Sequence, residues 1–215
     1  MQHKAGFYEK YIKRLLDIVL SGLALIVLSP LLLVTAILVR AKLGSPVIFC
    51  QERPGKDEKI FKLHKFRSMN DARDENGTLL PDKERLTGCG KKLRALSIDE
   101  LPELWDIFRG KMSIVGPRPL LVEYLPYYTE NERHRHDVRP GLTGLAQING
   151  RNTLTWEQKF AYDLEYVQRI SFCEDIKILF RTVGKVLNRS GVQVNTQSGE
   201  GNLAKIRSCV CEKAE

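Results

Sequence analysis

Residues 18–39 read IVLSGLALIVLSPLLLVTAILV, an apolar run without a charged side chain. As a straight helix, this run would extend about 33 Å, close to the hydrocarbon thickness of a bilayer. Pro30 lies inside the run, where a proline removes an intrahelical hydrogen bond and clashes with the preceding turn. The run therefore predicts a membrane helix that is broken or kinked at Ser29 and Pro30.

The charges on either side of the run leave two topologies open. The flanking basic residues are Lys10, Lys13, Arg14, Arg40 and Lys42. Because positive residues favour the cytoplasmic side, symmetric basic flanks suit a re-entrant helix-break-helix that leaves on the side where it entered. The alternative is a kinked transmembrane helix in which Ser29 bonds back to the carbonyl that Pro30 frees. The run alone slightly favours this alternative.

The net charge indicates what kind of partner the protein has. The chain has 215 residues and a formal net charge of +8, from 34 Lys and Arg against 26 Asp and Glu. Such a surplus suits nucleic acid, anionic lipid or a phosphorylated substrate. Beside an apolar run of membrane length, lipid and phosphate fit better, so we expect no nucleic acid as a partner.

Beyond the run, the sequence predicts a mainly helical α+β fold with a small β-hairpin. Residues 47–49 and 60–67 are the predicted strands, on either side of a turn at Pro54-Gly55. Residues 71–83 are predicted to be a surface loop. Helical spacing of apolar residues predicts helices at residues 98–108, 120–132, 156–170 and 175–189.

The last of these predicted helices is strongly amphipathic. Its basic residues Lys177, Arg181, Lys185 and Arg189 recur every four positions, and apolar residues occupy the other face. Such a helix suits the headgroup layer of an anionic membrane. The alternative is a core helix with a solvated basic face, but the apolar run elsewhere in the chain favours the interfacial role.

Asp99 and Glu100 are neighbouring carboxylates near the start of the predicted 98–108 helix. Ser97 and Glu100 also match a capping box, and Pro102 near the helix start fits that interpretation. Alternatively, the pair holds a divalent cation or carries a phosphate at the positive end of the helix. The motif alone favours the cap.

Basic residues in loops and at the ends of elements favour the functional interpretation of Asp99 and Glu100 over the capping box. They are Lys65, Arg67, Arg94, Arg118, Arg139 and Arg151. Arg118 stands between Pro117 and Pro119, which restrict its loop, and arginine forks beside glycine amides suit phosphate groups. With a carboxylate pair and a membrane run in the same chain, this set predicts chemistry on a phosphorylated lipid or nucleotide.

Five ordered motifs resemble those of the small monotopic phosphoglycosyl transferases of the bacterial sugar transferase family, and the resemblance covers residues 8–190. The motifs are Ser29-Pro30, Lys65-Phe66-Arg67-Ser68-Met69, Leu96-Ser97-Ile98-Asp99-Glu100-Leu101-Pro102, Val115-Gly116-Pro117-Arg118-Pro119 and Arg139-Pro140-Gly141-Leu142-Thr143-Gly144. Ser68 stands where the family often has threonine. Residues 138–152 are most similar to a member that transfers phospho-N,N'-diacetylbacillosamine.

This resemblance implies a monotopic protein of the bacterial inner membrane, with a re-entrant helix, interfacial amphipathic helices and a catalytic domain facing the cytoplasm. It implies transfer of a sugar-1-phosphate from a UDP-sugar to undecaprenyl phosphate, with release of UMP and with membrane lipid and downstream glycosyltransferases as further partners. The sugar stays open among an N-acetylated sugar, galactose and glucose.

The resemblance also implies roles for individual residues. Asp99 becomes the nucleophile and a ligand of Mg²⁺, with Glu100 beside it. The residues that match the family's phosphate and nucleotide contacts are Lys65, Arg94, Arg118 and Arg151, with Asp175 as a further position of the family type. Attack by Asp99 on the β-phosphorus would divide the transfer into two steps through an aspartyl-phosphosugar, while Mg²⁺ and the arginines neutralise charge.

We expect three units: a membrane segment at residues 1–40, a catalytic domain at 41–190 and a flexible polar tail at 191–215. A second hypothesis from the residues alone is a non-catalytic scaffold that binds anionic lipid at the membrane surface.

Overall fold

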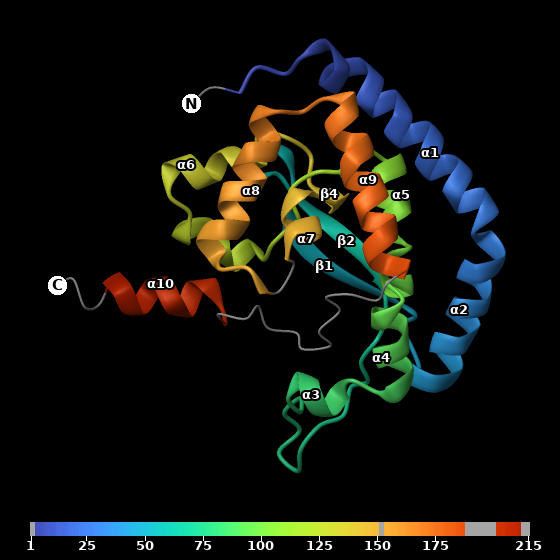
Figure 1. The fold of residues 1–215 in the computed structure, drawn as a ribbon. Coiled ribbons are helices and arrows are strands. Elements are labelled where there is room, and N and C mark those ends of the chain that lie inside the picture. The colour runs from blue at the N-terminus through green and yellow to red at the C-terminus, as the bar shows by residue number, and fades with distance from the viewer. Residues whose placement is uncertain (1–2, 151–152, 188–200, 212–215) are drawn as a thin grey trace.

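The computed structural model describes residues 3–150, 153–187 and 201–211, and it has the mainly helical α+β fold that the sequence predicts. Helices α1 (Arg14–Val27) and α2 (Ser29–Leu43) form an arc along one edge of the molecule, with the strands near its centre (Figure 1). The shorter helical segments are η1 (Tyr8–Lys13), η2 (Lys56–Glu58), α3 (Asp82–Arg85), α4 (Gly88–Ala95), η5 (His134–His136) and α7 (Leu145–Asn149).

The break between α1 and α2 lies at the serine and proline of the apolar run. The two helices are bent by 63°. Pro30 has no N–H for the carbonyl of Ile26, and Ser29 Oγ donates a hydrogen bond to that carbonyl at 2.7 Å instead. Among the described helices, none alone has the length and apolar composition needed to cross a membrane, whereas Tyr8–Val27 and Ser29–Leu43 taken together do.

Both ends of this bent pair contact the same domain. Near the start of the pair, Lys13 Nζ donates to Asp175 at 2.6 Å. At its other end, Val39 is fully buried and clusters with Leu43 and Phe66. The expected boundary at residue 40 therefore falls inside α2, because the last turn of that helix belongs to the core of the domain.

The predicted hairpin is confirmed. Strands β1 (Ile48–Pro54) and β2 (Ile60–Phe66) pair antiparallel, with Cys50 opposite His64. Side chains from β2 then pack on α5 (Glu103–Phe108) in a cluster that includes Phe61, Leu63, Leu104 and Ile107.

A second, two-stranded sheet was not predicted. Strands β3 (Ser113–Val115) and β4 (Gly141–Thr143) pair in parallel. The chain passes so closely here that a Cβ on Gly141 would lie 2.0 Å from the backbone nitrogen of Gly116. This approach places the proline-rich loop around Arg118 next to the glycine-rich loop that follows Arg139.

Two predicted helices are confirmed and one is shortened. Helix α8 (Trp156–Gln168) starts with a capping box at Thr155, and α9 covers Phe172–Leu187. The predicted 120–132 helix instead forms η4 (Val122–Tyr127), which contains a proline, and the short α6 (Glu130–Arg133).

Helix α9 exposes apolar as well as basic side chains. Ile178 is fully buried, whereas Phe180 is 75% exposed and Val183 57% exposed. The helix therefore has an inward and an outward apolar surface, and its contact with a membrane stays a prediction.

Part of the segment 191–215, where we expect a flexible polar tail, is helical. Residues Leu203–Cys211 form helix α10, and Leu203 is 1% exposed in a cluster with Tyr124 and Trp156. Arg207 donates two hydrogen bonds to Glu132, at 2.6 and 2.7 Å. The buried Leu203 and the partly buried Arg207–Glu132 ion pair hold this helix against the domain, although its surroundings in the sequence are polar.

Candidate active site

Six of the predicted site residues line one cleft of about 1100 Å³. They are Lys65, Arg67, Arg94, Asp99, Glu100 and Arg118. The end of the hairpin, α4, η3 (Ile98–Glu100) and the loop after β3 contribute them, so the fold brings together positions that are up to 53 residues apart in the sequence. Arg139 and Asp175 do not line this cleft, and Arg151 lies outside the described residues.

The capping box that the Ser97 motif alone favours does not form. Ser97 has a φ of +54° and its side chain caps no backbone group, while Pro102 directly precedes α5. The expected 98–108 helix is thus split into the single turn η3 and α5. The split presents Asp99 and Glu100 at the cleft instead of within a regular helix.

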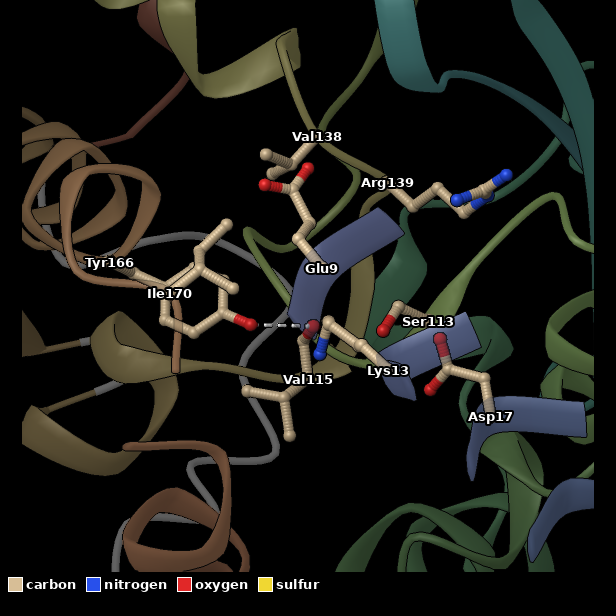
Figure 2. A pocket seen from close by; sticks show the side chains of 9 residues that line it. All are labelled: Glu9, Lys13, Asp17, Ser113, Val115, Val138, Arg139, Tyr166 and Ile170. Atoms are coloured by element: carbon tan, nitrogen blue, oxygen red, sulfur yellow. Dashed lines mark hydrogen bonds between the residues drawn. The ribbon is translucent and has the colours of Figure 1, made fainter. Parts of the chain in front are cut away.

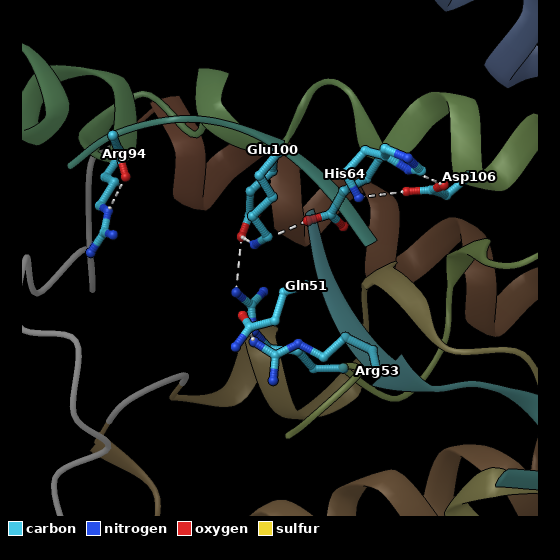
Figure 3. Close-up of polar contacts among 10 residues, drawn as sticks. Gln51, Arg53, His64, Arg94, Glu100 and Asp106 are labelled. Carbon is cyan, nitrogen blue, oxygen red and sulfur yellow. Dashed lines mark hydrogen bonds and ion pairs between the residues drawn. The ribbon is translucent and has the colours of Figure 1, made fainter. Parts of the chain in front are cut away.

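Glu100 is the centre of an ion-pair network. Its Oε1 accepts hydrogen bonds from Lys65 Nζ at 2.8 Å and from Arg118 at 2.9 Å, as the contacts around Glu100 in Figure 3 show. Burial alone would raise the pKa of Glu100, but Arg118 and Lys65 outweigh it and hold this pKa well below its usual range. Glu100 therefore stays ionised and holds two cations at the cleft.

Glu103 lies behind Glu100 and shares the same lysine. Its Oε1 is 3.0 Å from Lys65 Nζ, and its side chain is only 4% exposed. Burial and the negative charge of Glu100 raise the pKa of Glu103 to about 7, although Lys65 opposes the shift. The charge of this inner carboxyl thus changes near neutral pH.

The position of Lys65 is fixed by its neighbour on β2. Asp106 on α5 accepts hydrogen bonds from the backbone nitrogen of His64 at 3.0 Å and contacts its Nδ1 at 2.7 Å. Figure 3 shows this contact beside the Glu100 network. Asp106 is 1% exposed, so it clamps β2 onto α5 and aligns Lys65 with the two glutamates.

Asp99 differs from Glu100 in having no partner of its own. Within the described residues, no hydrogen bond or ion pair reaches its carboxylate, although its residue is only 8% exposed. Burial and the nearby charge of Glu100 raise the pKa of Asp99, against the opposing effect of Lys65, Arg94 and Arg118. A carboxylate with a raised pKa and free lone pairs, surrounded by cations, is suited to nucleophilic attack on phosphorus.

Arg67 and Arg94 line the cleft in different ways. Arg67 donates to the carbonyls of Met69 and Ser45 and pairs with Asp71, so contacts within the protein occupy its guanidinium. Arg94 donates one hydrogen bond, from Nε to Ser68 Oγ at 2.9 Å. Arg94 thus keeps donors for a phosphate, whereas Arg67 holds the loop after β2.

Arg139 lies at a second, much smaller cavity of about 20 Å³ beside η1 and α1. Figure 2 shows it there with Lys13, Asp17 and Ser113. Its Nε donates to the carbonyl of Gly110 at 3.0 Å. This cavity has room for about one water molecule, too little for a sugar nucleotide.

Asp175 is a buried anchor for the N-terminal segment. It accepts hydrogen bonds from Tyr8 at 2.7 Å, from Lys13 at 2.6 Å and from Tyr166 at 2.7 Å. Asp175 is 5% exposed. These contacts hold η1 against α8 and α9.

The acidic residues at the cleft fit a metal that is shared with substrate. No cluster of three or more His, Cys, Asp or Glu residues suited to a metal occurs in the described part of the chain. Glu100 already holds two cations, whereas the oxygens of the neighbouring Asp99 have no partner within the described residues and are available to a metal. Because Mg²⁺ is commonly bound by one or two carboxylates and substrate phosphates, Asp99 with a bound diphosphate would satisfy it.

Several residues at the cleft were not predicted as site residues. They are Arg53, Arg85, Tyr124, Gln147, Trp156 and Asp163. Arg53 was visible as part of the hairpin turn, and burial and the nearby Arg118 lower its pKa to about 10. The others stand in predicted helices or loops, where the sequence carries no signal that they face the cleft.

Comparisons with known proteins agree with this arrangement. The sequence pattern of the bacterial sugar transferase family matches residues 8–189, and the chain belongs to that family. It is 53% identical to the uncharacterized sugar transferase EpsL of Bacillus subtilis over 182 residues, which cover 85% of this chain and 90% of that protein.

Two longer relatives carry more specific names. The chain is 44% identical over 189 residues to the UDP-glucose:undecaprenyl-phosphate glucose-1-phosphate transferase of Klebsiella pneumoniae, covering 83% of this chain and 41% of that protein. It is 36% identical over 200 residues to the undecaprenyl-phosphate galactose phosphotransferase of Salmonella typhimurium, covering 85% of this chain and 42% of that protein. The chain thus spans less than half the length of these two, and the likeness to a bacillosamine transferase stays a prediction.

Proposed function

We propose that this protein is a membrane-bound phosphoglycosyl transferase that moves a sugar-1-phosphate from a UDP-sugar to undecaprenyl phosphate and releases UMP. The observation that carries the proposal is the partnerless carboxylate of Asp99 in a cation-lined cleft, next to an ionised Glu100 that is already paired. The names of the longer relatives support the same substrates.

The reaction proceeds in two displacements at the β-phosphorus. In the first, a carboxylate oxygen of Asp99 forms a bond to the β-phosphorus while the bond from that phosphorus to the bridging oxygen breaks. UMP leaves with the bridging oxygen and its electron pair. In the second, a phosphate oxygen of undecaprenyl phosphate attacks the same phosphorus, the bond to Asp99 breaks, and the aspartate is regenerated as a carboxylate.

The cations of the cleft lower the charge barrier of both displacements. Arg118 and Lys65 are held in place by Glu100, and Arg94 offers further donors toward the diphosphate. Magnesium held by Asp99 and the diphosphate would supply further positive charge against the leaving UMP. Asp99 itself has no hydrogen bond to break before it attacks.

The geometry of the apolar helices supports a re-entrant insertion. Both ends of the α1–α2 pair contact one domain, whereas exposed apolar side chains gather around the break. They are Leu23, Ile26, Val27, Leu33, Val34 and Ile37, with exposures from 56% to 72%. We place this apolar bend in the cytoplasmic leaflet of the inner membrane, which keeps the cleft at the depth of the acceptor phosphate.

The nucleophile is tested without acceptor. Purified protein incubated with a UDP-sugar labelled in the sugar should release UMP and retain label on the protein. Asp99→Asn should abolish both, whereas Asp82→Asn, which changes an exposed carboxylate at the edge of the same cleft, should retain both. An adduct of equal yield on Asp99→Asn would contradict the assignment.

The donor sugar is identified by a UMP-release screen with acceptor present. The panel includes N-acetylated UDP-sugars, which the family resemblance favours, and UDP-glucose and UDP-galactose. The absence of UMP release from all of them, combined with salt-sensitive binding to anionic liposomes, would instead support a non-catalytic lipid-binding scaffold.

The insertion is tested by labelling single cysteines at Ala5 and Ser45 in a background without the native cysteines. A membrane-impermeant reagent should reach both positions from the cytoplasmic side. Labelling of the two positions from opposite sides would establish an ordinary transmembrane helix.

A further inference from the structure

The wall of the cleft formed by α7 and α8 carries buried polar atoms that the mechanism above does not use. Gln147 on α7 lines the cleft and is 7% exposed. Within the described residues, neither its Oε1 nor its Nε2 has a hydrogen-bond partner. Because a buried polar group without a partner is costly, such a side chain in a binding cleft indicates a ligand that satisfies it.

The local backbone makes room for this amide. A Cβ added to Gly144 would lie 2.8 Å from Gln147 Oε1 and 2.2 Å from the carbonyl of Gly116. A side chain at position 144 would therefore displace the amide or the loop that carries Arg118. Glycine at this position keeps both in place.

Asp163 on α8 has a similarly unused atom. Its Oδ2 accepts hydrogen bonds from Arg135 Nε at 3.1 Å and from the same guanidinium at 2.7 Å. Its Oδ1 is buried and has no partner within the described part of the chain, although the residue lines the cleft. Both hydrogen bonds from Arg135 end on Oδ2, so Arg135 leaves Oδ1 available to a ligand.

Arg135 links this carboxylate to the catalytic cations. The same guanidinium donates to the backbone carbonyl of Arg118 at 2.7 Å. The unused acceptor on Asp163 is thus built into the same rigid network as the Arg118 loop. A ligand that binds Asp163 would therefore be held at a fixed position relative to Asp99 and Glu100.

We infer that Gln147 and Asp163 form the subsite that binds the nucleoside of the donor, an inference that rests on the proposed function. An amide offers a donor and an acceptor side by side, which matches the N3–H and a neighbouring carbonyl of uracil. The single acceptor on Asp163 suits a ribose hydroxyl. Tyr124 and Trp156 line the same cleft and form an aromatic part of its wall.

Ligand analogues test this inference on the wild-type protein. The dissociation constants of UMP, N3-methyl-UMP and 2',3'-dideoxy-UMP are measured by calorimetry on the full chain in lipid nanodiscs. Methylation at N3 should weaken binding by about tenfold or more, because it removes one bond of a bidentate pair and adds a clash. Removal of the hydroxyls should weaken it by about tenfold.

Variants then assign each loss to a residue. Gln147→Met should bind UMP and N3-methyl-UMP equally weakly, and Asp163→Ala, which removes both carboxylate oxygens, should no longer distinguish UMP from its dideoxy analogue. Gln168→Met, an exposed glutamine on the same helix as Asp163, should behave as wild type. Gln147→Met should also melt at or above the wild-type temperature without ligand, because it removes two unsatisfied polar atoms, and it should lose the stabilisation that UMP gives.

Equal binding of UMP and N3-methyl-UMP to the wild type would overturn the inference, even if the variants fail to fold. A Gln147→Met variant that binds UMP normally but changes its preference among UDP-sugars would also overturn it, by assigning the subsite to the sugar. Failure of the proposed function differs from both, because the wild type would then release no UMP from any UDP-sugar.

Discussion

Replacement of Glu103 by glutamine should stabilise the protein relative to wild type, by an amount that grows as the pH rises from about 4.5 to about 7 and then levels off. Glu103 is buried behind Asp99 and Glu100, the proposed catalytic pair, and its pKa is raised from 4.5 to about 7. Between these values the unfolded chain releases a proton that the folded protein retains. Ionisation of Glu103 therefore lowers the stability of the wild type as the pH rises toward 7.

The size of the effect follows from that difference in pKa. One pKa unit corresponds to about 1.4 kcal/mol, so the full shift amounts to about 3 kcal/mol. Solvent screening does not reduce it much, because the side chain of Glu103 is 4% exposed. The stabilisation is present below pH 4.5, is lost as the pH rises, and levels off above the folded pKa of about 7.

Urea unfolding of both proteins at pH 5, 6, 7 and 8 measures this difference. The free energy of unfolding of Glu103→Gln, relative to wild type, should rise by about 2.5 kcal/mol between pH 5 and pH 8, because part of the full shift has already occurred at pH 5. Glu165→Gln, which changes an exposed carboxylate paired with Arg169, should show no such trend. A difference for Glu103→Gln that stays flat, or falls with pH, would refute the reasoning and show that Lys65 stabilises the ionised form.

Two further predictions concern packing. Gly90→Ala should greatly lower the melting temperature, because its Cβ would lie 1.8 Å from the backbone oxygen of Ser68, whereas Gly88→Ala faces open space and should melt near wild type. Leu203→Ala should lower the free energy of unfolding by about 2 to 5 kcal/mol in urea, because Leu203 is 1% exposed, and Ile206→Ala, at an exposed position of the same helix, should cost far less. Equal melting of the two glycine variants, or equal costs for the two α10 variants, would contradict the packing described for these positions.

The elements that the sequence predicted well are those that local signals determine. The hairpin has a turn at Pro54-Gly55 between runs of alternating side chains, and α8 has a capping box at Thr155. Neighbours within a few residues supply these signals, so a single sequence contains them.

Asp99 and Glu100, the proposed catalytic pair, show why features that depend on tertiary contacts could not be predicted from the sequence. Ser97 and Glu100 have the spacing of a capping box, but the partners of Glu100 come from 35 and 18 residues away. Two cations at hydrogen-bond distance outweigh one backbone N–H as partners of a carboxylate. A local sequence pattern does not show that Lys65 and Arg118 compete with the backbone for Glu100, because they reach Glu100 only after the hairpin and the loop after β3 have packed. The same holds for Gln147 and Asp163, whose lack of partners is a property of the folded cleft.

The topology of the apolar run was open for a different physical reason. A re-entrant helix pair and a kinked transmembrane helix bury the same side chains in lipid, and Ser29 satisfies the carbonyl freed by Pro30 in either case. What separates them is where the ends attach. Lys13 bonds to Asp175 at one end, and Val39 is buried beside Phe66 at the other. A straight helix would carry these ends about 39 Å apart, on opposite faces of a bilayer, and one domain cannot contact both. The 63° bend turns α2 away from the axis of α1, and the contacts of both ends with the same domain support insertion from one side.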